Sequence, residues 1–152
     1  MSEPIDRSTI WPYDERGEAR PLYYQRAGSP TVIAAEEELG RLDGGTALLF
    51  PSGAGATTTV VLARLRPGDT IALAEGAYYG TGATFEILGT WGLHVVEFDQ
   101  TGPPPENADL IWLEAPSNPF LTMPDLEAAV AHPALVVVDA TVATPIHLRG
   151  DG

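Results

Sequence analysis

Apolar residues run without interruption from Ala134 to Val138 and lead directly into the carboxylate of Asp139. Runs of this length that are rich in β-branched residues are typical of strands buried on both faces of a parallel sheet. We therefore predict a buried strand over residues 134–138, with Asp139 at its carboxyl end, where open α/β sheets bind their ligands. An aspartate that only caps the following turn is the competing interpretation.

Before this strand, short apolar runs alternate with helical patterns. The apolar runs predict strands over residues 46–50, 70–74, 93–98 and 109–113. The helical patterns predict helices over residues 31–42, 54–65, 81–91 and 124–131. Strands that alternate with helices favour right-handed crossovers. The predicted fold class is therefore α/β, with a mostly parallel sheet and flanking helices.

The ends of the chain's first helix carry clear local signals. Residues 1–22 are polar, interrupted by proline and without periodicity, so we expect an N-terminal arm there and the folded part over residues 23–152. Ser29 can cap the helix that follows, and Pro30 suits its first position. The glycines at 44 and 45 predict where it ends.

Composition narrows the possible classes of function. The formal net charge of −13 argues against nucleic acid and anionic membranes as partners. No apolar run approaches membrane-spanning length, and the acidic N-terminus lacks a secretory signal, so we expect a cytoplasmic protein. The chain has no cysteine, which excludes disulfides and thiolate sites. All eight basic residues are arginine, so the chain has no lysine and its N-terminus is its only primary amine.

Two short segments could bind an anion or a planar ring. Ser52-Gly53-Ala54-Gly55-Ala56 precedes a predicted helix, where small residues let backbone amides approach a phosphate; a tight turn that binds nothing is the alternative. Tyr78-Tyr79-Gly80-Thr81 follows a predicted strand, and its tyrosines could stack on a ring or simply pack.

A third segment, Glu114-Ala115-Pro116-Ser117-Asn118-Pro119, favours a binding role. Its two prolines restrict the backbone on either side of Asn118, and rigid loops after strands often carry binding residues, although a rigid turn alone remains open. The histidines, by contrast, are expected to be structural. No carboxylate–histidine pattern has metal-ligand spacing, so we expect no metal site.

Five motifs, in order, resemble those of the Cys/Met metabolism (transsulfuration) family of pyridoxal 5′-phosphate (PLP) enzymes. Four are Tyr24-Gln25-Arg26 with Ser29-Pro30-Thr31, Ser52-Gly53-Ala54-Gly55, Tyr78-Tyr79-Gly80-Thr81 and Pro116-Ser117-Asn118-Pro119; the fifth is Val137-Val138-Asp139-Ala140-Thr141. The resemblance implies the aspartate-aminotransferase-like fold, PLP fold type I. It identifies residues 23–152 as the N-terminal portion of the large PLP-binding domain, ending before the strand of the Schiff-base lysine.

The resemblance also assigns roles to particular residues. Gly53 and Ala54 would offer backbone amides to the cofactor phosphate, and Tyr78 would stack on the pyridine ring. Asn118 would meet the ring hydroxyl. Asp139 would pair with the ring nitrogen and keep it protonated. Thr141 belongs to the same motif as Asp139, so we expect it to bind the cofactor as well. Tyr24 and Arg26 would reach the phosphate of a neighbouring subunit, which implies an oligomer.

The missing lysine sets this chain apart from the family it resembles. We expect the N-terminal half of an enzyme of the cystathionine synthase/lyase type, acting on an amino-acid substrate by β- or γ-elimination or replacement. The lysine would come from another polypeptide, either a lysine-bearing C-terminal half or a homologous full-length subunit. Catalytic residues are therefore not expected within this chain. The alternatives are a lysine-less scaffold partner of a homologous enzyme, a truncated inactive product, or a Rossmann-like nucleotide binder, for which the glycine fingerprint is missing.

Overall fold

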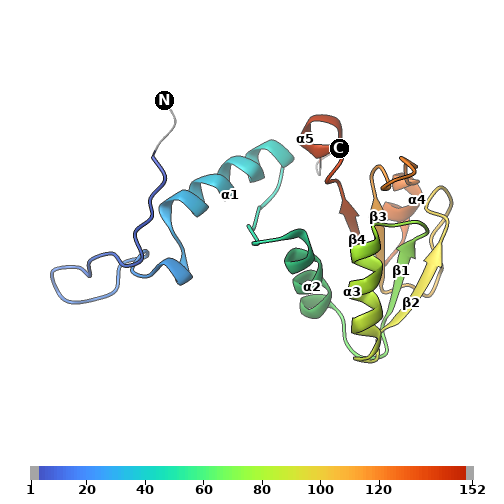
Figure 1. The fold of residues 1–152 in the computed structure, drawn as a ribbon, viewed down its shortest axis with the longest axis horizontal. Helices are drawn as coiled ribbons and strands as arrows, with labels where there is room; N and C mark the ends of the chain where they lie inside the picture. The colour runs from blue at the N-terminus through green and yellow to red at the C-terminus, as the bar shows by residue number, and fades with distance from the viewer. Residues whose placement is uncertain (1–3, 150–152) are drawn as a thin grey trace. The chain divides into compact units, whose positions relative to one another are not determined.

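A computed structural model describes residues 4–149, which divide into two compact units. Of the described residues, 4–49 and 149 belong to unit 1, and Phe50–Leu148 form unit 2. Within unit 1 the regular elements are a short 3-10 helix, Gln25–Ala27, and helix α1, Pro30–Asp43 (Figure 1).

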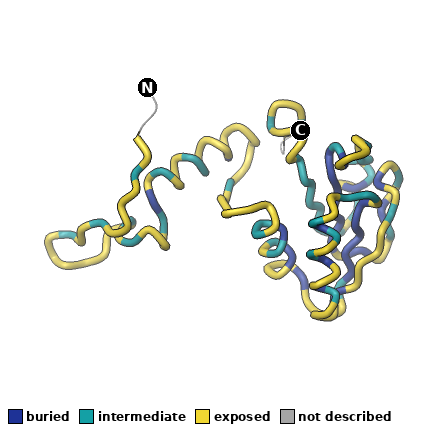
Figure 2. The backbone as a smooth tube through the Cα atoms, in the orientation of Figure 1, coloured by how far each residue is buried: buried dark blue, intermediate teal, exposed yellow. Residues whose placement is uncertain are grey.

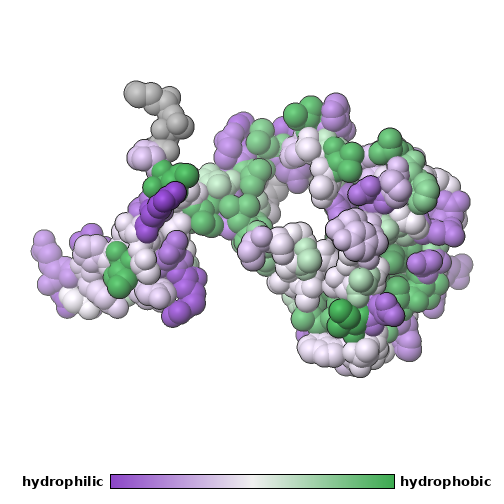
Figure 3. Space-filling view, in the orientation of Figure 1, coloured by the Kyte–Doolittle hydropathy of each residue, from purple (hydrophilic) through white to green (hydrophobic). Residues whose placement is uncertain are grey.

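Helix α1 begins and ends as its local signals predict. The Ser29 hydroxyl accepts a hydrogen bond from the amide of Val32 at 3.3 Å, and Pro30 stands in the first turn. Gly44 ends the helix with φ of 75°, a left-handed conformation that glycine adopts without strain. Figure 3 shows hydrophobic side chains gathered over this helix, and its exposed large apolar residues are Val32, Ile33, Leu39 and Leu42.

The N-terminal segment is hydrogen-bonded to the residues that precede α1. Ile10 pairs with Tyr24 in an isolated antiparallel bridge. The amide of Trp11 donates to the carbonyl of Tyr23 at 3.1 Å, and the amide of Gln25 donates to the carbonyl of Thr9 at 2.9 Å. Part of the predicted arm is thus held against the segment that follows it.

Unit 2 is built on a four-stranded sheet in which every strand pair is parallel. The strands are β1 (Thr70–Ala74), β2 (His94–Phe98), β3 (Leu110–Glu114) and β4 (Leu135–Asp139), in the spatial order β2-β1-β3-β4. The helices are α2 (Gly53–Arg64), α3 (Tyr79–Gly89), α4 (Leu126–Ala131) and α5 (Thr144–His147). The α/β class with a parallel sheet and flanking helices is therefore confirmed.

The two faces of this sheet carry separate apolar clusters because side chains alternate along each strand. On one face, Leu73 and Trp112 pack with Val61 of α2 and Phe85 of α3. On the other face, Ile111 and Leu113 pack with Ala129 of α4. Strands β1 and β3 lie between the clusters and are buried along their whole length, as Figure 2 shows.

Two predictions about strands are wrong. Residues 46–50 are not a strand, because no other segment of residues 4–149 pairs with them; the Leu49 amide instead donates to the Glu36 carboxylate at 2.8 Å. Strand β4 exists but is only half-buried along its length, not buried on both faces. It forms one edge of the sheet, so one side of it has no neighbouring strand among the described residues. Helix α5 occupies a segment for which no helix was predicted.

Each of the other predicted helices and strands begins and ends within two residues of its predicted bounds. Helix α3 begins two residues earlier than predicted, which places Tyr78 directly at its N-terminus. Among the helices of residues 4–149, none has the length and hydrophobicity needed to cross a membrane.

Candidate cofactor site

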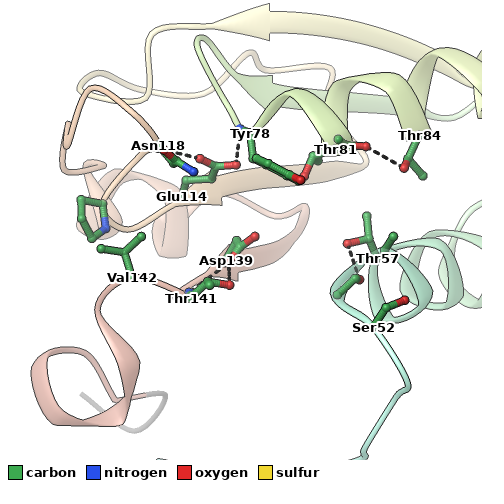
Figure 4. Close-up of a pocket in the computed structure, with 14 residues that line it drawn as sticks. Ser52, Thr57, Tyr78, Thr81, Thr84, Glu114, Asn118, Asp139, Thr141 and Val142 are labelled. Carbon is green, nitrogen blue, oxygen red and sulfur yellow. Dashed lines mark hydrogen bonds between the residues drawn. The ribbon is translucent and has the colours of Figure 1, made fainter.

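A cavity of about 470 Å³ lies within unit 2 at the carboxyl ends of the strands. Its lining comes from the ends of β3 and β4 and the loops that follow them, from Tyr78 and the first turns of α3, and from the N-terminal part of α2. Figure 4 shows Tyr78 on one side, Asp139 and Thr141 across from it, and Ser52 and Thr57 on a third side. This edge is where parallel sheets of α/β proteins bind ligands.

The N-terminus of α2 presents free backbone amides to the cavity. The Ser52 hydroxyl accepts from the amide of Gly55 at 3.1 Å, and the first helical bond runs from the Ala56 amide to the Ser52 carbonyl. The amides of Gly53 and Ala54 are consequently left without an intrahelical partner. Because the helix dipole adds positive potential there, the geometry suits an anion such as a phosphate.

Tyr78 supplies an aromatic face to the cavity, and the neighbouring Gly80 makes room for its ring. A Cβ atom on Gly80 would lie 2.5 Å from Cε1 of Tyr78, closer than any real contact, so the ring position requires glycine there. The Tyr79 ring lies 4.7 Å away, centroid to centroid, and tilted by 58°. The Tyr79 phenol raises the pKa of Tyr78, mainly through hydrogen bonding and secondly through charge repulsion. Tyr78 therefore stays neutral to a higher pH than an ordinary tyrosine.

Glu114 lies between the Tyr78 and Asn118 loops and is buried, with 2% of its surface exposed. Its Oε1 accepts from the backbone amide of Tyr78 at 2.5 Å, and its Oε2 accepts from the backbone amide of Asn118 at 3.1 Å (Figure 4). Gln100 holds the backbone of Glu114 from the other side, donating to its carbonyl at 3.0 Å and accepting from its amide at 3.1 Å.

Asp139 projects into the cavity from the end of β4, and Thr141 orients its carboxylate. Oδ1 accepts from the Thr141 amide at 3.0 Å and from the Thr141 hydroxyl at 2.5 Å. Within residues 4–149, no donor makes a hydrogen bond to Oδ2. One carboxylate oxygen is therefore fixed, and the other is free to accept a proton donor from a ligand.

Six of the eight residues predicted to bind the cofactor line this one cavity: Gly53, Ala54, Tyr78, Asn118, Asp139 and Thr141. The other two, Tyr24 and Arg26, belong to unit 1, where the Arg26 guanidinium lies 4.7 Å from the centroid of the Tyr24 ring. Their role at a neighbouring subunit stays a prediction. In the described part of the chain, no group of three or more acidic or histidine side chains could hold a metal ion.

Several residues of the lining have no individual role predicted from the sequence, although Ser52, Thr81 and Glu114 lie in segments predicted to bind a ligand; the full set is Ser52, Thr57, Thr81, Thr84, Glu114 and Val142. Ser52 and Glu114 had a recognisable signal. A serine directly before a helix is a common N-cap, and a glutamate that ends the apolar run Leu110-Ile111-Trp112-Leu113 needs a hydrogen-bonding partner if it is buried.

The sheet, its helices and the cavity at its carboxyl edge define an α/β fold of the PLP fold-type-I class, as the solved structures below confirm. The chain belongs to the Cys/Met metabolism PLP-dependent enzyme family, whose sequence profile matches residues 1–150. The predicted resemblance to this family is therefore confirmed.

Relatives in this family are named for cystathionine chemistry. The chain is 34% identical over 158 residues to the cystathionine gamma-synthase of Mycobacterium tuberculosis, covering 95% of this chain and 41% of the relative. It is 35% identical over 153 residues to the cystathionine gamma-lyase of Bos taurus, covering 91% of this chain and 37% of the relative. The chain thus spans about two fifths of the length of the curated relatives it matches.

Solved structures agree with this assignment. The crystal structure of metB from Corynebacterium glutamicum superposes with a TM-score of 0.85 at 34% identity, covering 95% of this chain and 41% of that one. The cystathionine gamma synthase from Xanthomonas oryzae pv. oryzae, in complex with aminoacrylate and cysteine, superposes with a TM-score of 0.83 at 34% identity, covering 93% of this chain and 40% of that one.

The chemistry of the cavity fits the family's cofactor. PLP carries a phosphate, an aromatic ring and a protonated ring nitrogen. The cavity offers the two unpaired amides of Gly53 and Ala54, the aromatic side chain of Tyr78 and the free Oδ2 of Asp139. Each of these three groups of PLP therefore has a matching group among the residues that line the cavity.

Proposed function

We propose that residues 1–152 form the PLP-binding portion of an enzyme of the cystathionine synthase/lyase type, which acts on amino acids by β- or γ-elimination or replacement. The observation that carries the proposal is the convergence of α2 amides, the Tyr78 ring and the Asp139 carboxylate on one cavity. Family membership and the names of the relatives support the reaction class.

Six residues of the cavity have a task in this proposal. When bound, PLP supplies an electron-accepting ring that stabilises negative charge developing on the substrate. The amides of Gly53 and Ala54 bind the phosphate. Asp139 holds the proton on the ring nitrogen, which keeps the ring electron-poor, and Thr141 keeps the carboxylate oriented. Tyr78 stacks on the ring and Asn118 meets the ring hydroxyl.

The lysine that bonds the cofactor must come from outside residues 1–152, because these contain none. In the split-enzyme form of the proposal it stands on a second polypeptide, a lysine-bearing C-terminal half or a homologous subunit. Tyr24 and Arg26 would then serve the phosphate of a neighbouring subunit in an oligomer. The absence of lysine also favours a second candidate, a non-catalytic partner that stabilises a homologous enzyme.

Borohydride reduction, which makes the bond between PLP and an amine permanent, separates these candidates. Residues 1–152, treated with PLP and borohydride, should gain no adduct on any internal residue. Mixed with the lysine-bearing segment, the assembly should gain one adduct, on that segment's lysine, and should turn over an amino-acid substrate.

Turnover that is independent of residues 1–152 would instead support the non-catalytic partner. An adduct on an internal residue of 1–152 would contradict the argument from the missing lysine. We refer below to residues 1–152 together with the lysine-bearing segment as the assembled protein.

A further inference from the structure

We propose that Glu114 is a positioning residue, which holds the Tyr78 ring and the Asn118 amide in fixed relation to each other across one side of the cavity. The inference rests on the proposed function, since it gives a role to the residues that would contact the ring. It assigns no contact of Glu114 with the reacting atoms.

The Glu114 carboxylate joins two loops that are distant in sequence. Tyr78 follows β1 and Asn118 follows β3, and each loop donates one backbone amide to a different oxygen of the same carboxylate. A shift of either loop would therefore lengthen a hydrogen bond to a buried charge, which is costly. The carboxylate thus couples the positions of the two loops.

The carboxylate itself has a rigid base. Gln100 hydrogen-bonds both the amide and the carbonyl of Glu114, and its Nε2 also donates to the carbonyl of Thr122 at 3.0 Å. Thr122 closes the Asn118 loop, because it accepts from the Ser117 amide at 3.0 Å and donates its own amide to the Ser117 hydroxyl at 3.0 Å. The base and the far end of this loop are therefore fixed by the same glutamine.

An ionised carboxylate suits this task better than any neutral side chain of similar size. Two amide donors need two acceptors, and a carboxylate offers two oxygens, whereas the amide of glutamine offers one oxygen and one donor NH₂. Among the described residues, no arginine or histidine forms an ion pair with Glu114. The side chain of Glu114 is therefore satisfied by the two loop amides rather than by a cation.

The test replaces Glu114 by glutamine in the assembled protein without PLP. The ligand is pyridoxine 5′-phosphate, which has the ring and the phosphate of PLP but no aldehyde, so binding does not depend on the lysine. Calorimetry gives the dissociation constant, and the circular dichroism of the bound ring reports how the ring is held. We expect E114Q to weaken binding at least tenfold and to change the circular dichroism of the bound ring.

Glu97→Gln is the matched control, because Glu97 is an exposed residue of the edge strand β2. It should leave the dissociation constant and the circular dichroism within twofold of the parent. Glu114→Asp is a second variant in case E114Q does not fold: it keeps the charge but is one methylene shorter, so it should reach at most one loop amide and weaken binding by several fold.

A second background separates positioning from a general effect on stability. In a Tyr78→Ala background the ring that Glu114 positions is gone. There, E114Q should raise the dissociation constant of pyridoxine 5′-phosphate threefold or less. Two results would overturn the inference but leave the proposed function standing. One is an equal loss of affinity from E114Q in both backgrounds; the other is a parent that binds the ligand and an E114Q variant that binds it equally well. Absence of pyridoxine 5′-phosphate binding by the parent would overturn the proposed function and the inference with it.

Discussion

The close approach of Tyr78 to Gly80 gives a prediction that two glycine substitutions on one helix can test. At Gly80, an added methyl group would lie 2.5 Å from Cε1 of Tyr78. Carbon atoms in contact prefer about 3.5–4.0 Å, so the ring must move by about 1 Å. At Gly82, two residues further along α3, an added methyl group meets no atom within 4 Å.

The two substitutions should therefore have opposite consequences. Alanine is favoured over glycine in a helix by up to about 1 kcal/mol, so Gly82→Ala should raise the free energy of unfolding by about 0.5–1 kcal/mol. Gly80→Ala should not raise the free energy of unfolding in this way, because the added methyl group displaces the Tyr78 ring. A well-placed aromatic pair is worth about 0.5–1.5 kcal/mol, so Gly80→Ala should also weaken pyridoxine 5′-phosphate binding by about 2- to 12-fold.

Urea unfolding of the assembled protein gives the first quantity and calorimetric titration gives the second. Gly82→Ala should bind the ligand as the parent does. The reasoning would be refuted if Gly80→Ala stabilised the protein as much as Gly82→Ala and bound pyridoxine 5′-phosphate with unchanged affinity.

Three further predictions concern the ring contacts, the core and one exposed loop. Asp139→Asn should weaken pyridoxine 5′-phosphate binding by about 10- to 150-fold, since a hydrogen bond to a charged group contributes about 1.5–3 kcal/mol. Asn118→Ala, which removes a neutral hydrogen bond, should weaken binding about fivefold. Calorimetry compares the two dissociation constants, and the reverse order would contradict the assigned roles. Phe85→Ala, at a side chain with 0% exposure, should lower the free energy of unfolding by about 3–5 kcal/mol in urea denaturation, and a loss below about 1 kcal/mol would be inconsistent with the packing. Hydrogen bonds from the Thr101 amide and hydroxyl lower the pKa of Asp99, so the stability that Asp99 contributes is present above its unfolded pKa and is lost as the pH falls through the lower, folded value. Thr101→Val should move the pKa of Asp99 upward in an NMR titration, and an unchanged pKa would show that the backbone amide alone is responsible.

Local signals in the sequence were sufficient for most of the fold. The caps of α1 and the alternation of apolar runs with helical patterns act over a few residues, and they gave the right class and strand positions. Residues 46–50 show the limit of this reasoning. Their apolar pattern is that of a strand, but a strand also needs a neighbour to pair with, and no local pattern reveals whether one exists.

Strand β4 and Glu114 show the same limit at the cavity. The apolar run before Asp139 predicts complete burial, yet the residues of β4 are half-buried because the strand is at an edge of the sheet within residues 4–149. The partners of Glu114 are the amides of Tyr78, 36 positions away, and Asn118, four positions away. Only the fold brings these loops to one carboxylate.

A crystal structure of the assembled protein with bound PLP tests the central claim most directly. The account predicts phosphate oxygens within about 2.7–3.2 Å of the Gly53 and Ala54 amides, the ring against Tyr78, and the ring nitrogen within the same distance of Asp139. Electron density for PLP outside this cavity, or inside it with the ring nitrogen turned away from Asp139, would contradict the account.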